Sequence, residues 1–214
     1  MRLPSPLYVI LDREAARGRA LPDLLDAVLA GGARLVQLRD KTLSMADLLP
    51  MARALRARCR AAEALFIVND RADLALAVDA DGLHVGQDDL PAAAARRILP
   101  PPMLLGVSTH DPAQARQAVA DGADYVAVGS MFPTATKAGF QLVGPELLRR
   151  VRSDVPGPLV AIGGITEANV AEVMAAGADA AAVISAVCGA PDPQAETARF
   201  LSAIGLSAPP GQGR

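Results

Sequence analysis

Polar and charged residues follow several apolar, strand-like runs in this chain of 214 residues, and the first such cluster is Gln37-Leu38-Arg39-Asp40-Lys41. Because side chains alternate along a strand, Gln37, Arg39 and Lys41 are expected on one side of it. A buried glutamine and arginine are costly without a partner, and an anionic ligand is a suitable partner. An internal ion pair with Asp12 or Asp70 would satisfy the same charges, so this cluster alone leaves both interpretations open.

Carboxylates follow the next two apolar runs. Asp70 comes directly after one of them, and Asp88 and Asp89 follow the other. Magnesium prefers a small number of carboxylates together with water and phosphate oxygens. We therefore predict Asp70 and Asp89 as ligands of Mg²⁺. A structural alternative is that Asp88 or Asp89 caps the helix expected to begin near Leu90-Pro91.

A long segment between two further apolar runs, residues 131–141, carries Thr134, Thr136 and Lys137. Two hydroxyls and an ammonium group at this spacing could surround a diphosphate with hydrogen-bond donors. The alternative is a solvated surface turn. Long loops that follow a strand are typical of lids and binding loops, so we favour the functional interpretation.

A hydroxyl and two histidines complete the set of candidate catalytic groups. Ser108 ends an apolar run, and its hydroxyl could reach a ligand. His84 lies inside an apolar run, where a lone histidine is usually a hydrogen-bonded core residue, and His110 is no stronger a candidate. Asp111 precedes Pro112 and is expected to cap a helix.

The last two apolar runs end in residues that suit a phosphate group. Gly163-Gly164 follows one run, and Ile184-Ser185 follows the other. Glycine allows backbone N–H groups to approach an anion, and a helix N-terminus adds a favourable dipole. A pair of glycines alone is weak evidence, but it becomes stronger at the ends of the last two strands of a barrel.

The elements that must position these residues alternate strand with helix along the chain. Eight strand-helix pairs are expected, which is the number that closes a (βα)8 (TIM) barrel of the α/β class. The predicted strands are Leu7–Asp12, Arg34–Arg39, Leu65–Asn69, Gly82–Gly86, Leu104–Ser108, Tyr125–Ser130, Leu159–Gly163 and Ala180–Ser185. Helical patterns between them include Leu21–Ala30, Ala46–Arg60, Pro112–Ala120 and Glu167–Ala176.

A short repeat supports this order. The tetrapeptides Ala30-Gly31-Gly32-Ala33, Ala120-Asp121-Gly122-Ala123 and Ala175-Ala176-Gly177-Ala178 each come between an expected helix and the next strand. Glycine there can adopt the left-handed conformation that ends a helix, so we interpret these glycines as structural. One barrel domain is expected over residues 1–206, with a disordered tail at 207–214.

Composition limits the other classes of function. The 21 Lys and Arg against 23 Asp and Glu give a formal charge of −2, so no overall positive field favours nucleic acid or anionic lipid. No apolar stretch reaches membrane-spanning length, and the N-terminus does not resemble a secretory signal. We expect a cytoplasmic protein with neither a nucleic-acid nor a membrane partner. Cys59 and Cys188 fit no zinc or redox spacing and are expected to be inert thiols.

Taken in order, the strand-end motifs closely resemble those of the thiamine phosphate synthase family. They are Gln37-Leu38-Arg39-Asp40-Lys41, Asn69-Asp70, His84-Val85-Gly86-Gln87-Asp88-Asp89, Gly106-Val107-Ser108, Pro133-Thr134-Ala135-Thr136-Lys137 and Ile162-Gly163-Gly164-Ile165-Thr166. The resemblance covers nearly the whole chain. It implies a magnesium-dependent transferase that joins a hydroxymethylpyrimidine diphosphate to a thiazole phosphate and releases pyrophosphate.

The resemblance also implies a role for each matching residue. Lys137, Ser108 and Arg39 would act on the reacting groups. The diphosphate would be held by Gln37, Arg39, Lys41, Asn69 and Lys137, magnesium by Asp70 and Asp89, and the thiazole phosphate by Thr134, Thr136, Gly164, Ile184 and Ser185. The thiazole nitrogen that attacks carries no proton, so no general base is needed, and catalysis is expected to be electrostatic and positional.

Two other functions fit parts of the same pattern. An isomerase of the same lineage, a thiazole tautomerase, shares the barrel but needs a proton shuttle and is expected to lack the complete diphosphate and magnesium set. A barrel that only binds thiamine precursors is the second alternative, and the retained set of costly charges argues against it.

Lys137 is followed by Ala138-Gly139-Phe140, where family members often carry further polar residues. The sequence is also compatible with a homo-oligomer.

Overall fold

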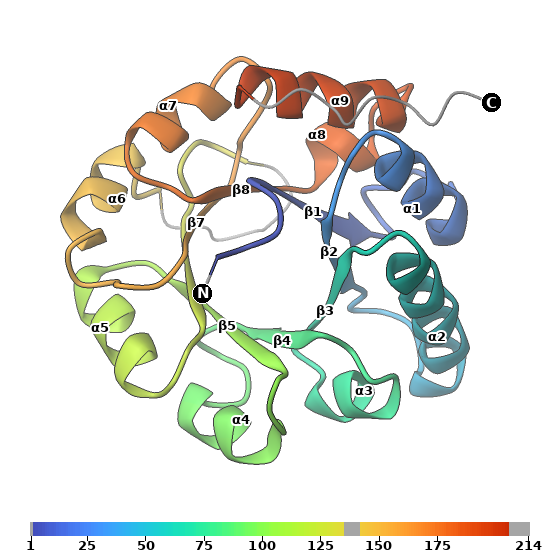
Figure 1. The fold of residues 1–214 in the computed structure, drawn as a ribbon, viewed down its shortest axis with the longest axis horizontal. Coiled ribbons are helices and arrows are strands. Elements are labelled where there is room, and N and C mark those ends of the chain that lie inside the picture. The colour runs from blue at the N-terminus through green and yellow to red at the C-terminus, as the bar shows by residue number, and fades with distance from the viewer. Residues whose placement is uncertain (1, 135–141, 206–214) are drawn as a thin grey trace.

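The computed structural model describes residues 2–134 and 142–205, and it forms a closed barrel of eight parallel strands that pair in chain order, surrounded by helices (Figure 1). The strands are β1 (Leu7–Asp12), β2 (Leu35–Arg39), β3 (Leu65–Asn69), β4 (Gly82–Val85), β5 (Leu104–Thr109), β6 (Tyr125–Val128), β7 (Leu159–Ile162) and β8 (Ala180–Val183). The helices are α1 (Leu21–Ala30), α2 (Met45–Ala61), α3 (Ala72–Ala77), α4 (Ala92–Ile98), α5 (Pro112–Ala120), α6 (Pro145–Val151), α7 (Val170–Ala175), α8 (Ser185–Cys188) and α9 (Pro193–Ala203).

The predicted order of elements is confirmed, and the differences are at element ends. Four predicted strands ran too far: Gly86, Gly129-Ser130, Gly163 and Ile184-Ser185 lie beyond the last residues of their strands. Most of these residues belong to the turns that leave the barrel, and Ser185 is the first residue of α8. Helix α7 begins at Val170 rather than at Glu167. The predicted tail at 207–214 lies outside the described residues.

Two apolar cores result from the alternation of side chains along the strands. In β1, Leu7, Val9 and Leu11 belong to the core between the barrel and its helices. Tyr8 and Ile10 belong to the core inside the barrel. The N-terminal segment crosses the ring of strands in Figure 1, and its Leu3 packs against the interior core. Every strand thus has one face toward the helices and one toward the barrel axis.

The repeated glycines take the conformation expected of helix ends. Gly32, Gly122 and Gly177 have φ angles of +103°, +90° and +105°, in the left-handed region that favours glycine. Asp111 caps α5 by accepting a hydrogen bond from the backbone N–H of Gln114 at 2.8 Å, as predicted. The predicted cap on α4 is wrong, because its N-cap residue is Pro91 and no side chain caps the helix.

Three aspartates brace the rim where the strands begin. Asp81, Asp124 and Asp179 precede β4, β6 and β8, and each carboxylate accepts a 2.7 Å hydrogen bond from a backbone N–H in the preceding strand. Each also pairs with an arginine that lies in a helix or directly after one: Arg56, Arg96 and Arg152. A carboxylate that joins two strands and a helix favours the closed barrel, so this rim has a structural role.

The two cysteines are buried and form no disulfide. Burial raises the pKa of the Cys59 thiol to about 12 and that of Cys188 to about 11, so both are protonated and unreactive at neutral pH. This confirms their interpretation as inert thiols. Among the described helices, none combines the length and apolar character needed to cross a membrane.

Candidate active site at the carboxyl ends of the strands

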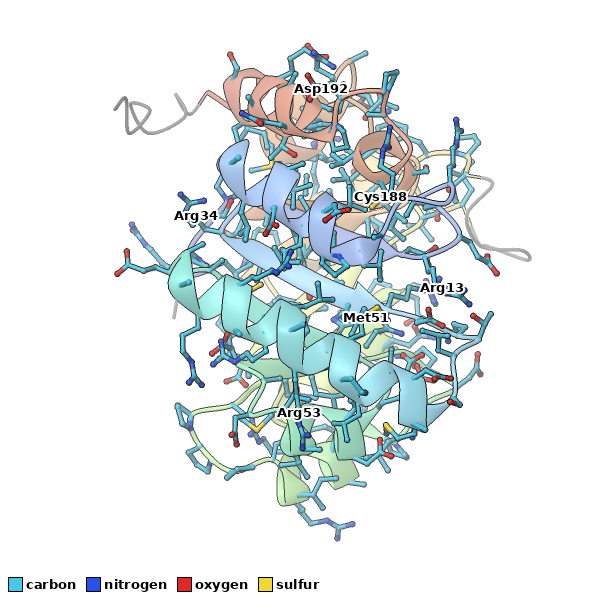
Figure 2. All side chains as sticks on the ribbon, turned by 90° about the vertical axis from the view of Figure 1, so that its right-hand side faces the viewer. Arg13, Arg34, Met51, Arg53, Cys188 and Asp192 are labelled. Atoms are coloured by element: carbon cyan, nitrogen blue, oxygen red, sulfur yellow. The ribbon has the colours of Figure 1, made fainter. Side chains whose placement is uncertain are left out.

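The predicted site residues that the structure describes gather at one end of the barrel. Figure 2 shows the molecule from the side, with Arg34, which precedes β2, at one end and Arg13, which follows β1, at the other. The register pairs Asp12 with Arg39 across β1 and β2 at the Arg13 end. A cavity of about 50 Å³ at this end is lined by Asp12, Arg13, Glu14, Arg39, Asp40, Lys41 and Thr42. A larger hollow, of about 500 Å³, lies beside α9 and contains none of the predicted residues.

The cations of β2 have partners in the protein. Arg39 forms an ion pair with Asp12, and the Lys41 ammonium lies 2.7 Å from a carboxylate oxygen of Asp70. Both ion pairs that the sequence left open as alternatives are therefore formed. The side chains of Arg39 and Lys41 remain 22% and 53% exposed, so both also face the mouth of the barrel. An ion pair in the protein and contact with an anion are compatible at this position.

The carboxyl groups of Asp70 and Asp89 lie close enough to shift each other's pKa, although their loops follow different strands. Burial, followed by the proximity of Asp89, raises the pKa of Asp70. Burial opposes the shift of Asp89, but the neighbouring Asp70 carboxyl and the hydrogen bond from the backbone N–H of Gly86 lower its pKa. Asp70 also has φ +61°, which is uncommon for a residue with a side chain. The two loops therefore hold two carboxyl groups against one another.

Inside the barrel, below this mouth, a line of polar side chains runs through the interior core. Gln37 Nε2 donates to the Tyr8 hydroxyl at 2.6 Å, and the hydroxyls of Tyr8 and Tyr125 lie 3.0 Å apart. The Tyr125 hydroxyl lies 3.0 Å from Nδ1 of His84, whose Nε2 lies 2.8 Å from Oγ of Ser108. The line thus connects β2, β1, β6, β4 and β5 and joins two of the predicted substrate-binding residues.

The environment keeps the line uncharged. Burial lowers the pKa of His84 from 6.5 to about 4, so its ring is neutral at physiological pH. Burial also raises the pKa of both tyrosine hydroxyls, Tyr8 and Tyr125. The prediction that His84 is a hydrogen-bonded core residue is confirmed. The tyrosines were missed, although a tyrosine in an otherwise apolar strand carries a hydroxyl that needs a buried partner.

The far side of the mouth is built around two glycines. Gly163 and Gly164 have φ angles of +103° and +65°. A Cβ at Gly164 would lie 2.5 Å from the carbonyl oxygen of Pro133, so the loop after β6 packs directly on this backbone. The same loop carries Thr134, and Ser185 begins α8 directly after Ile184. Thr136 and Lys137 lie outside the described residues.

The remaining predicted residues are placed as follows. Asn69 ends β3, and the register sets it beside His84. His110 lies at the mouth, where its Nδ1 is 2.6 Å from the carbonyl oxygen of Gly129. Because a carbonyl oxygen only accepts hydrogen bonds, Nδ1 of His110 carries the hydrogen. This bond ties the loop after β5 to the turn after β6, which is a structural role.

Comparisons with known proteins give a consistent assignment. Residues 7–187 match the profile of the family described as "Thiamine monophosphate synthase". A thiamine-phosphate synthase of Moorella thermoacetica is 50% identical over 200 residues, which cover 92% of this chain and 95% of that protein. One of Methanoculleus marisnigri is 53% identical over 188 residues, covering 87% and 89%.

Solved structures agree with the sequence comparison. The thiamine phosphate pyrophosphorylase of Pyrococcus furiosus superimposes with a TM-score of 0.86 at 36% sequence identity. The match covers 93% of this chain and 95% of that one. Fold, strand-end residues and sequence similarity agree over nearly the whole barrel. The chain therefore belongs to the thiamine monophosphate synthase family.

Proposed function

We propose that this protein is the transferase that couples 4-amino-2-methyl-5-hydroxymethylpyrimidine diphosphate to 4-methyl-5-(2-phosphoethyl)thiazole, forming thiamine phosphate and pyrophosphate. The observation that carries the proposal is the meeting of Lys41, Asp70 and Asp89 at one barrel mouth, in a chain of this family. A cation beside two facing carboxyl groups suits a metal-bound diphosphate rather than a simple monophosphate. Two small molecules are therefore its partners.

The reaction needs charge neutralisation more than proton transfer. The bond between the pyrimidine methylene carbon and the diphosphate oxygen breaks, and its electron pair leaves with the diphosphate. The thiazole nitrogen then donates its own pair to that carbon, with no proton to remove. Arg39, Lys41 and Lys137 offset the growing negative charge, and the Ser108 hydroxyl donates a hydrogen bond to it. Gln37 and Asn69 hold the pyrimidine diphosphate in place.

The carboxyl pair fits a magnesium ion. Burial and the neighbouring Asp89 raise the pKa of Asp70, and a divalent ion bound by both carboxyl groups would offset the repulsion between them. Within the described residues no group of three or more acidic, histidine or cysteine side chains could hold a metal. Two carboxylates suit Mg²⁺, which takes its other ligands from water and phosphate. When bound, Mg²⁺ supplies positive charge that makes diphosphate a better leaving group.

The second substrate is assigned to the opposite side of the mouth. The backbone of Gly164 approaches the loop that carries Thr134, and Ile184 and Ser185 leave β8 beside it. Loops after the last two strands of such barrels commonly bind phosphate through backbone N–H groups. We assign the thiazole phosphate to this side, with Thr136 contributing from outside the described residues. Two anions at opposite sides of one mouth bring the two rings together.

A comparison of single substrates with the pair tests this function. The protein is incubated with Mg²⁺ and the pyrimidine diphosphate alone, the thiazole phosphate alone, or both, and the products are separated by chromatography. A synthase forms thiamine phosphate only from the pair. Conversion of a thiazole phosphate tautomer in the absence of pyrimidine would indicate the isomerase instead. Binding of both compounds with no product would indicate a barrel that only binds thiamine precursors.

A further inference from the structure

The line of polar side chains from Gln37 to Ser108 consists of four hydrogen bonds in series. All of it lies within the barrel: Tyr8, Tyr125, Gln37 and His84 are each at most 6% exposed. No buried side-chain nitrogen or oxygen of the described residues lacks a hydrogen-bond partner. Each member therefore has to use its hydrogens in a way that satisfies its neighbours.

The number of hydrogens restricts how the line can be arranged. A phenol has one hydrogen to donate, and a neutral imidazole has one N–H and one acceptor nitrogen. If Gln37 donates to Tyr8, the Tyr8 hydrogen can go only to Tyr125, and the Tyr125 hydrogen only to Nδ1 of His84. Nε2 of His84 then carries the ring hydrogen and donates to Ser108. The hydroxyl hydrogen of Ser108 is left over for a further partner.

Turning the Gln37 amide by half a turn reverses every bond in the line. The amide oxygen then accepts from Tyr8, which accepts from Tyr125, which accepts from Nδ1–H of His84. Nε2 of His84 accepts from Ser108, whose hydrogen is now used inside the protein. A mixed arrangement would either leave one phenol hydrogen buried without an acceptor or hold the two phenol oxygens 3.0 Å apart with no hydrogen between them, and both are costly. The hydrogen bonds of the line can therefore run in two consistent directions. When the direction changes, Gln37 and Ser108 exchange donor and acceptor roles together.

We propose that Tyr8, Tyr125 and His84 are positioning residues that couple the orientation of the Gln37 amide to the hydrogen-bonding character of the Ser108 hydroxyl. The inference rests on the proposed function, because it assigns both ends to the pyrimidine diphosphate. In the structure Gln37 Nε2 donates to Tyr8, so the amide oxygen of Gln37 is the acceptor end of the side chain. A ligand amino group can donate to that oxygen and hold the amide in this orientation.

The coupling links recognition of one part of the substrate to stabilisation of another. An amino group of the pyrimidine that donates to Gln37 fixes the direction of the hydrogen bonds in the line. In that direction the Ser108 hydroxyl donates outward. An outward Ser108 hydroxyl can donate to an oxygen of the diphosphate, which only accepts. A pyrimidine with a carbonyl in place of the amino group would turn the amide and withdraw that donor. The stabilisation of the leaving diphosphate by Ser108 therefore depends on whether the pyrimidine carries an amino group or a carbonyl group.

The neutral state of His84 is consistent with this arrangement. A charged ring would donate from both nitrogens, so Tyr125 would have to donate to Tyr8; while Gln37 also donates to Tyr8, the Tyr8 hydrogen would be left without an acceptor. Burial lowers the pKa of His84 to about 4, which keeps the ring neutral. Gly106 provides the space for the contact, since a Cβ there would lie 2.3 Å from the Tyr125 hydroxyl and 2.5 Å from Nδ1 of His84.

Nitrogen-15 NMR of histidine-labelled protein tests the direction of the line without any activity measurement. The chain has two histidines, and His110, with its hydrogen on Nδ1, serves as the internal reference. We expect His84 in the wild-type protein to carry its hydrogen on Nε2. In Gln37→Glu the carboxylate can only accept, so we expect the His84 hydrogen to move to Nδ1. The change is read three hydrogen bonds away from the substitution.

Two further variants show that the line transmits the change. Adding Tyr125→Phe to Gln37→Glu breaks the line and should prevent the full transfer to Nδ1. Thr109→Val is the matched control, because Thr109 is a buried hydroxyl of β5 that donates to the carbonyl oxygen of Ala127 outside the line. It should leave the His84 tautomer unchanged. The same His84 tautomer in wild type and folded Gln37→Glu would overturn the proposal.

Kinetics decide the matter if Gln37→Glu does not fold. Ser108→Ala and Tyr125→Phe should each lower kcat about tenfold, the worth of one hydrogen bond to a charged group. The double variant should be no slower than Ser108→Ala alone, because Tyr125 acts through Ser108. If the kcat losses of the two single variants multiplied in the double variant, the coupling would be refuted, although the wild-type enzyme would still be active. An inactive wild-type protein would instead refute the proposed function. The NMR experiment would still test the direction of the hydrogen-bonded line.

Discussion

Gly106 in β5 lies so close to Tyr125 in β6 that a Cβ built on the glycine would be 2.0 Å from Cζ of the tyrosine ring. No side chain larger than a hydrogen fits between the strand and the ring. The tyrosine hydroxyl is thereby held within 3.0 Å of both the Tyr8 hydroxyl and Nδ1 of His84. A glycine inside a strand usually weakens the strand. Here the missing side chain leaves the space that the buried line of polar side chains requires.

Gly106→Ala should therefore displace the Tyr125 ring. We expect the free energy of unfolding to fall by about 2 kcal/mol, as in other overpacked cores, and kcat to fall with it. Thermal or urea unfolding together with steady-state kinetics measures both. Gly157→Ala is the control, because its Cβ would meet only one atom, the Asp124 carbonyl oxygen, at 3.2 Å. Equal effects of the two substitutions would show that the space at Gly106 has no special role.

Acidification should destabilise the fold through His84. The unfolded chain binds a proton near pH 6.5, whereas the folded protein does so only near pH 4. Between these values the unfolded state holds more protons, so the free energy of unfolding falls as the pH falls. From pH 7 to pH 5 the loss should be about 2 kcal/mol. Urea unfolding across this range measures the slope, and His84→Gln should remove most of it; an unchanged slope would contradict the assignment.

Asp81→Ala should lower stability and leave catalysis intact. The substitution deprives the Phe66 N–H and the Arg56 guanidinium of their carboxylate. We expect a loss of about 2 kcal/mol in the free energy of unfolding. The control is Asp26→Ala, whose ion pair with Arg58 is exposed and should contribute less than about 1 kcal/mol. A large fall in kcat for the folded Asp81 variant would contradict a purely structural role of this rim.

Lys137→Ala and Asp89→Ala should show the opposite pattern. Each should lower turnover far more than it lowers folding stability, because the side chains are assigned to the diphosphate and to magnesium. Asp88→Ala is the matched control for Asp89, since Asp88 is its exposed neighbour. Chelation of Mg²⁺ should abolish turnover while binding of the thiazole phosphate, measured by calorimetry, persists. Equal losses of turnover and stability would mark these residues as structural.

The sequence predicts the barrel because its signals are local. Alternating apolar runs, helical periodicity and glycines such as Gly32 and Gly122 at helix ends are each visible within about ten residues. The strand-end positions follow from the same pattern, which is why Arg39, Asp70 and Ser108 could be placed at one mouth. Strand ends at Gly86 and Gly163 were less accurate, because the turn begins where ladder bonds stop, and that depends on the neighbouring strand.

The interior line could not be predicted, because its members are up to 117 residues apart and come from five strands. Which side chains meet across a barrel depends on the stagger of the strands, which the sequence does not display. The signal that was available is the presence of Tyr8 and Tyr125, the only tyrosines, inside apolar strands. The hydrogen bond from the Gly86 N–H to Asp89 could not be predicted either, because it depends on a local turn that replaces the expected helix cap.

The rate of pyrophosphate release tests the central claim most directly. Purified protein with Mg²⁺ and both substrates should release pyrophosphate and form thiamine phosphate in equal amounts, and omitting the thiazole phosphate should stop both. The Lys137→Ala variant measured in parallel excludes a contaminating enzyme. No pyrophosphate above background with both substrates present would contradict the assignment of this barrel as the coupling enzyme.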